Sequence, residues 1–90
     1  MARKPLPSEE RPLVLVKFGL AVRQYRKELG MTQEEFADAC GIDRSYMGGV
    51  ERGERNLALV NTARIIKTLN MKPSEFFKAL DEVDLTSNQN

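Results

Sequence analysis

The residues with the clearest capacity for chemistry are Arg44, Ser45 and Tyr46, which follow Asp43, an expected helix-capping residue. An arginine guanidinium can donate two parallel hydrogen bonds to O6 and N7 of guanine, worth about 1–3 kcal/mol of discrimination between bases. A serine hydroxyl suits either kind of base, and a tyrosine offers a ring edge and a hydroxyl. A lone arginine at a helix start opposes the helix dipole, which favours a DNA contact for Arg44 over a solvated charge. For Tyr46, base reading and core packing both stay open.

A second group of polar residues is suited to DNA phosphates. Thr32 and Gln33 stand at the start of another expected helix, where free backbone N–H groups and the dipole attract anions. Arg52, Arg55 and Asn56 follow the helix that Arg44 begins, and they are candidate backbone contacts. The alternatives are that Gln33 is only a good helix former and that residues 52–56 are an ordinary polar loop.

Composition excludes most enzyme chemistry. The chain has 90 residues, one cysteine and no histidine, so it lacks the usual zinc ligand sets, histidine-dependent triads and an internal disulfide. We therefore expect no enzyme, no metal, no cofactor and no small-molecule ligand, with Cys40 as inert packing. No apolar run approaches the roughly 20 residues that span a bilayer, and the start lacks a signal peptide. A cytoplasmic location without membrane contact is expected.

Five short helices are expected to position these side chains, at residues 12–29 with Pro12 in the first position, 33–40, 44–52, 58–69 and from 73 onward. Apolar residues recur in them at steps of three and four, as in amphipathic helices. The first helix is expected to bury Val14, Phe18, Val22, Tyr25 and Leu29, and the fourth to bury Leu59, Ala63, Ile66 and Leu69. The sequence thus predicts a compact all-α domain over residues 12–82, with a flexible arm at 1–11 and a disordered tail at 83–90.

Residues 32–52 form the most informative unit. Thr32 and Glu35 have the spacing of a capping box, and Gly41 can adopt the left-handed conformation that ends a helix. Asp43 then caps another short helix, and the pair is expected to be held on the core by Ala37, Ile42, Met47 and Val50. A short helix, a tight turn and a second capped helix predict a helix-turn-helix, whose second helix enters a DNA major groove.

The same residues carry a resemblance to a known family. The string MTQEEFADACGIDRSYMGGVERGERN, with Arg23 and Arg26 before it and LALVNTARIIKTLNMKPSEFF after it, is similar to the phage repressor/Cro-type (XRE-like) helix-turn-helix family. The resemblance covers residues 17–80. Within the family, the small size and the DRSY…ERGERN pattern most resemble controller proteins of restriction–modification systems. The resemblance implies a lambda-repressor-like fold and a sequence-specific transcriptional regulator that binds double-stranded DNA.

Site roles follow from the matched positions. Gln33 matches the family glutamine that bonds a phosphate and braces the next helix, and Asn56 matches the backbone clamp in the loop. Arg44, Ser45 and Tyr46 stand where the family's base-reading side chains lie. The match also makes Glu51 the internal ion-pair partner of Arg26.

Gly48 and Gly49 depart from the commoner family pattern, which has longer side chains there. Each glycine costs a helix about 1 kcal/mol relative to alanine. We expect their bare backbone to let the helix approach the groove closely. Base discrimination should then concentrate at residues 44–46, with part of the specificity coming from DNA deformability.

Apolar residues near the C-terminal end raise the question of self-association. They exceed what one small core needs, and the resemblance implies a homodimer on a pseudo-palindromic operator, with recognition helices about 34 Å apart. The alternative is that they only cap the core of a monomer. The expected dimer residues are Leu69, Met71, Phe76, Phe77 and Leu80.

Two functions from different classes follow. The first is a dimeric DNA-binding regulator, acting as repressor or activator. The alternative is an antitoxin-like protein-interaction module in which DNA binding is secondary. The net charge is only +1, but Arg44, Arg52 and Arg55 surround one helix with mainly Glu54 opposing them. This clustering of arginines around one helix favours the DNA-binding regulator. Because few phosphate contacts are made, its DNA affinity should depend less steeply on salt than that of a highly basic protein.

Overall fold

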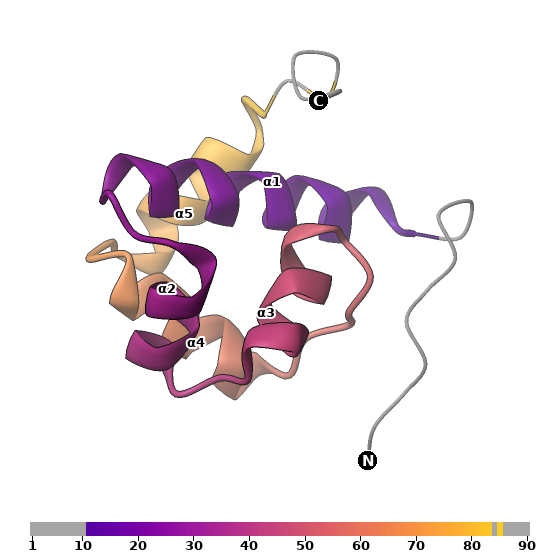
Figure 1. Ribbon diagram of the computed structural model, residues 1–90. Coiled ribbons are helices and arrows are strands. Elements are labelled where there is room, and N and C mark those ends of the chain that lie inside the picture. The colour runs from indigo at the N-terminus through magenta and orange to yellow at the C-terminus, as the bar shows by residue number, and fades with distance from the viewer. Residues whose placement is uncertain (1–10, 84, 86–90) are drawn as a thin grey trace.

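The computed structural model describes residues 11–83 and 85, and over that part of the chain it contains five α-helices and no strand. The helices are α1 (Leu13–Glu28), α2 (Gln33–Cys40), α3 (Arg44–Glu51), α4 (Leu59–Thr68) and α5 (Pro73–Leu80). Helix α1 lies across the others, with α2, α3 and α4 on one side of it and α5 alongside it (Figure 1). The predicted all-α fold with five helices is confirmed.

Local signals in the sequence set the helix ends. Thr32 Oγ1 accepts from Glu35 N at 3.1 Å while Thr32 N donates to Glu35 Oε1 at 2.8 Å, which completes the expected capping box of α2. Gly41 ends α2 in the left-handed conformation at φ 71°. Asp43 Oδ2 accepts from Ser45 N at 2.9 Å and Tyr46 N at 3.2 Å, which caps α3. These two caps fix the turn between the helices, and with it the direction of α3.

The core lies where all five helices meet. Its largest fully buried side chains are Val22, Phe36, Met47, Val50, Ile65, Ile66 and Phe76. The expected core stripes of α1 and α4 each include two residues that are exposed. Val14 and Leu29 are 58% and 47% exposed, because α1 has 16 residues and extends beyond the eight-residue helices α3 and α5 packed against it. Of the residues expected to be buried on α4, Leu59 and Ala63 are exposed, because Ile65 joins Ile66 and Leu69 on the face turned to the core.

Helix α5 contributes to the core more than the sequence indicated. Phe76 is fully buried, and its ring packs edge-on against Phe18 with 5.0 Å between centroids. Leu69 and Leu80 are also buried, and Met71 is half-buried against the same core. Phe77, at 44% exposed, is the one side chain of the five expected dimer residues that lies largely on the surface. Four of the five expected dimer residues are therefore buried or half-buried in the core of a single subunit.

Both predicted terminal segments need correction at their inner ends. Residues 1–10, which make up nearly all of the expected arm, lie outside the described residues, as do 84 and 86–90 of the expected tail. Arg11 falls within the predicted arm, but its guanidinium donates to the carbonyl oxygen of Arg52, the residue that caps the end of α3. Val83 was counted with the tail, but it packs against the core. Arg11 and Val83, just outside the predicted range 12–82, therefore both contact the domain.

Gly19 sets the distance between α1 and α3, a role that the sequence analysis missed. A Cβ atom added at Gly19 would lie 2.5 Å from the carbonyl oxygen of Glu51, and it would also meet the carbonyl oxygen of Val50. No side chain fits there, so the two helix backbones touch directly at this point. The periodicity of α1 could have located it, because Gly19 falls between the buried residues Phe18 and Val22.

Candidate nucleic-acid interface

The start of α3 presents two of the three expected base-reading side chains to solvent. Arg44 and Ser45 are exposed, and both follow the capping residue Asp43 directly. Because Asp43 satisfies the backbone N–H groups of Ser45 and Tyr46, the first turn of α3 is fixed without using either side chain. A guanidinium and a hydroxyl therefore stand at the tip of a rigid helix, as base reading in a groove requires.

Tyr46 differs from its two neighbours. Its side chain is half-buried and packs against the core. The guanidinium carbon of Arg55 lies 5.4 Å from the centre of the ring, a cation–π distance. Tyr46 is thus partly a core residue and partly a platform for Arg55, which joins the start of α3 to the loop that follows it.

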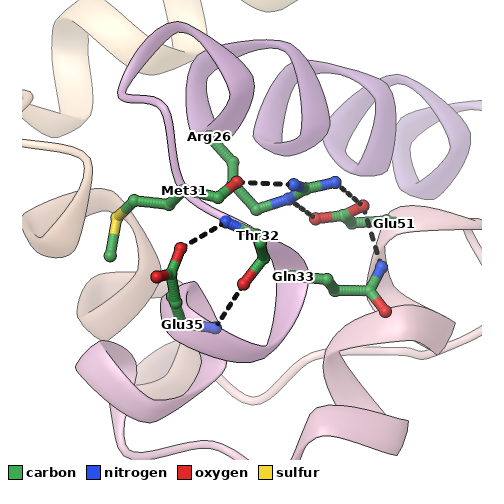
Figure 2. A network of polar contacts seen from close by, with 6 residues as sticks. All are labelled: Arg26, Met31, Thr32, Gln33, Glu35 and Glu51. Atoms are coloured by element: carbon green, nitrogen blue, oxygen red, sulfur yellow. Dashed lines mark hydrogen bonds and ion pairs between the residues drawn. The ribbon is translucent and has the colours of Figure 1, made fainter.

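Gln33, Glu51 and Arg26 form one buried polar network that ties α2 and α3 to α1 (Figure 2). Arg26 donates to Glu51 from Nε at 2.7 Å and from Nη2 at 3.1 Å. Its Nη1 donates to the carbonyl oxygen of Met31 at 2.8 Å, just before α2 begins. The Arg26–Glu51 ion pair that the resemblance implied is present, and both side chains are nearly inaccessible to solvent.

Gln33 links α2 to the Arg26–Glu51 ion pair through a third hydrogen bond to the Glu51 carboxylate. Its Nε2 donates to Glu51 Oε1 at 3.0 Å, so the first residue of α2 is held against the last residue of α3. The side chain is half-buried, which leaves part of it accessible at the start of α2. Thr32, immediately before it, is exposed and uses its hydroxyl oxygen as the helix cap. These two residues therefore place the positive end of α2 beside α3.

Arg52 follows the last residue of α3, and its guanidinium is hydrogen-bonded to the carboxylate of Glu54. Its Nε and Nη2 donate to Glu54 at 2.9 and 3.2 Å, and Arg11 Nη2 donates to the same carboxylate at 3.1 Å. The hydrogen bond from Arg52, with the arginine charges around it, lowers the pKa of Glu54 below its ordinary value. Glu54 is therefore ionised at neutral pH, and it neutralises much of the charge that Arg52 would show a phosphate.

Gly48 and Gly49 do not form the bare surface that we expected. Both are buried under arginine side chains. A Cβ at Gly48 would lie 3.1 Å from Arg52 Nη1 and 3.3 Å from Gln33 Oε1, and a Cβ at Gly49 would lie 2.9 Å from Arg55 Cγ. The two glycines thus leave space for the side chains of Arg52 and Arg55, which pack against α3 at these positions. Their backbone is covered in this arrangement and is not a bare surface for close approach to DNA.

The remaining candidates are placed as follows. Asn56 is exposed in the loop between α3 and α4, next to half-buried Arg55. Cys40 is buried in the core, and burial raises the pKa of its thiol, so it is a poor nucleophile. Among residues 11–83 and 85, no group of three or more acidic, cysteine or histidine side chains is placed to hold a metal ion. In that part of the chain no helix is long and apolar enough to cross a membrane.

Comparison with known proteins gives one family and a consistent set of relatives. The helix-turn-helix family model matches residues 22–76. The control protein C.MunI of a Mycoplasma species is 34% identical over 70 residues, which cover 77% of this chain and 95% of that protein. The control protein C.BamHI of Bacillus amyloliquefaciens is 41% identical over 59 residues, covering 64% of this chain and 73% of that one.

Solved structures agree with these matches. The restriction–modification controller protein C.AhdI from Aeromonas hydrophila superposes with a TM-score of 0.67 at 49% identity, covering 70% of this chain and 96% of that chain. C.Esp1396I bound to a 25 base pair operator site superposes with a TM-score of 0.70 at 36% identity, covering 77% of this chain and 91% of that one. The described fold therefore has counterparts among restriction–modification controller proteins of known structure.

Proposed function

Because this chain belongs to the helix-turn-helix family of transcription regulators, as do the controller proteins it resembles, we propose that it controls transcription by binding a pseudo-palindromic operator as a homodimer. The observation that carries this proposal is the start of α3, where Arg44 and Ser45 are exposed on a capped helix braced against α1 and α2. A DNA-binding regulator acts where the DNA is, so the proposed location is the cytoplasm. The relatives are regulators, so no catalytic step is assigned.

The proposed division of labour follows the chemistry of each group. Arg44 and Ser45 read base edges in the major groove, and the Tyr46 hydroxyl contributes at the edge of its half-buried ring. Thr32, Gln33, Arg52, Arg55 and Asn56 contact the sugar–phosphate backbone and set the register of α3 in the groove. The antitoxin-like alternative would not need these two sets of groups together on one side of the helix-turn-helix.

For the homodimer, the structure favours a different surface from the one that the sequence suggested. Leu59 and Val60 begin α4 and are 82% and 63% exposed, the most exposed large apolar side chains among the described residues. Leu59 and Val60 come only a few residues after Arg55 and Asn56 in the chain. If a second copy docked on this surface, the Arg55–Asn56 loops of the two subunits would lie near the two-fold axis and could contact the same stretch of DNA. A charged side chain introduced at this surface should therefore separate the two subunits.

Two measurements test these statements. In a selection from random duplexes, the purified protein should enrich two inverted half-sites about one helical turn apart. Enrichment of no symmetric sequence at moderate salt would refute the regulator. In sedimentation, Leu59→Asp should shift the protein from dimer to monomer, whereas Phe77→Asp should remain dimeric. The opposite pattern would place the interface on α5, and two dimeric variants would exclude both surfaces.

A further inference from the structure

Glu54 is a carboxylate that is hydrogen-bonded to Arg11 and to Arg52, one of the residues proposed to contact the DNA backbone. Its Oε2 accepts from Arg52 Nε and Arg11 Nη2, at 2.9 and 3.1 Å, and its Oε1 accepts from Arg52 Nη2 at 3.2 Å. Arg11 also donates from Nη1 to the carbonyl oxygen of Arg52 at 3.2 Å, so it is anchored to the end of α3. Two arginines that are 41 residues apart in the sequence therefore share one acceptor.

The geometry of this cluster resembles the way an arginine binds a phosphate. Arg52 presents two N–H groups to two oxygens, as a guanidinium does to a phosphate, so a phosphate and Glu54 would compete for the same donors. The backbone keeps Glu54 in place, because Glu54 N donates to the carbonyl oxygen of Gly49 at 2.8 Å. The Glu54 side chain is 15% exposed and that of Arg52 is 59% exposed, so Arg52 has the greater freedom to move away.

The arginine is the mobile partner in this exchange. The Arg52 side chain is 59% exposed, and ion pairs at that degree of exposure are weak and readily broken. A phosphate held at a fixed distance by the operator register can therefore replace Glu54. On DNA of another sequence no phosphate would be held at that place, so the contact between Arg52 and Glu54 would persist.

We propose that Glu54 is an internal competitor for DNA phosphate, which withholds Arg11 and Arg52 from non-operator DNA and releases them to the operator backbone. This inference rests on the proposed function, and it identifies how the same surface limits non-specific binding. Non-specific affinity is almost entirely electrostatic, so withholding two cations acts most strongly there. It also explains how a chain with a net charge of only +1 can keep several arginines on one face.

The first test is the salt dependence of binding to a random duplex that lacks the selected operator. Glu54→Gln keeps the side-chain shape and removes the charge. If both arginines then engage phosphates, the slope of log K against log salt steepens by up to about 1.8, and affinity at 0.1 M salt rises about eightfold for each arginine. The matched control is Glu82→Gln, the same loss of charge at an exposed residue beyond α5, which should change affinity less than about twofold.

The second test is a cycle with Arg52→Ala, measured on the random duplex. In the wild-type background this change should have little effect, because Glu54 already withholds the side chain. In the Glu54→Gln background it should abolish about half of the gain in affinity and in slope. An equal effect in both backgrounds, or an unchanged slope for Glu54→Gln, would overturn the inference and leave Glu54 as a structural tie of the loop.

Failure of the inference is distinguishable from failure of the proposed function. If the wild-type protein enriches a symmetric operator but Glu54→Gln leaves the salt slope on random DNA unchanged, only the competitor role is refuted. If the wild type enriches no operator, the proposed function is refuted, and the competitor role with it. Circular dichroism of Glu54→Gln should match that of the wild type, because the backbone contact from Glu54 N to Gly49 does not involve the side chain.

Discussion

Replacing Glu51 by glutamine is expected to lower the free energy of unfolding by about 3–5 kcal/mol, because it leaves a buried arginine without its counter-charge. The side chains of Arg26 and Glu51 are only 9% and 4% exposed, so water cannot take over the lost interaction. The carboxylate accepts three hydrogen bonds, two from Arg26 and one from Gln33. Glutamine can accept at one oxygen only, and its amide nitrogen would face the guanidinium.

The magnitude is large on the scale of a small domain. Domains of this size are stable by about 5–15 kcal/mol, so the variant would lose a substantial part of its margin. Its melting temperature should fall by at least about 12 °C, at about 4–8 °C for each kcal/mol. Urea unfolding at neutral pH, followed by circular dichroism, measures the change directly. Glu28→Gln is the matched control, since Glu28 is exposed at the end of α1, and it should stay within about 0.5 kcal/mol of the wild type.

A double variant separates desolvation from shape. Arg26→Met with Glu51→Met removes both charges and fills much of the same space, so it should be more stable than Glu51→Gln alone. The reasoning is refuted if Glu51→Gln unfolds with the same free energy as Glu28→Gln. It is also refuted if the double variant is less stable than the single one, since the cost would then lie in lost contacts and not in the unpaired charge.

Three further predictions concern the packing of α3 and its arginines. Gly19→Ala should destabilise the fold by about 2 kcal/mol or more in urea unfolding, because the new methyl group meets the carbonyl oxygens of α3; wild-type stability would contradict the direct backbone contact. Gly49→Ala should displace Arg55 from the ring of Tyr46 and weaken operator binding about eightfold at 0.1 M salt if one phosphate contact is lost, while the unfolding free energy stays the same or rises. Unchanged operator affinity would show that the position of Arg55 does not matter. Arg52→Ala should raise the pKa of Glu54 toward its ordinary value of 4.5, measured by carbon-13 NMR of the carboxyl group. Because the pKa of Glu54 is lowered in the folded protein, its contacts stabilise the fold at neutral pH, and that contribution is lost as the pH falls through the lowered pKa. If Arg52→Ala leaves the pKa of Glu54 unchanged, the hydrogen bond from Arg52 is not its cause.

The helices and their ends could be predicted because their signals are local. Thr32 with Glu35, Gly41 and Asp43 each act through hydrogen bonds or backbone angles within a few residues, and the structure has the bonds and angles that the sequence indicated. The exposed start of α3 followed from the same reasoning. Local chemistry was therefore sufficient to locate the helix-turn-helix and its two exposed residues.

The parts that could not be predicted depend on contacts between distant segments. Periodicity placed Ala63 in the core and left out Ile65, whereas Ile65 is fully buried and Ala63 is exposed, because the neighbouring helices decide which face of α4 is covered. Burial of Phe76 depends on its contact with Phe18, far away in the sequence. The role of Arg11 requires Glu54 to lie beside it, and no local pattern brings these two residues together.

The central claim is that α3 reads bases through its first residues while the neighbouring loop only positions it. The most direct test repeats the selection from random duplexes with Arg44→Ala and Asn56→Ala, with Lys78→Ala on the exposed face of α5 as a control for lost side-chain bulk and charge. Arg44→Ala should relax or change the enriched sequence at the base pair it contacts, with a loss of about 1–3 kcal/mol of discrimination, whereas Asn56→Ala should enrich the wild-type sequence with uniformly weaker binding. If Arg44→Ala enriches the same sequence as the wild type with undiminished discrimination, the reading of bases by α3 through Arg44 is contradicted.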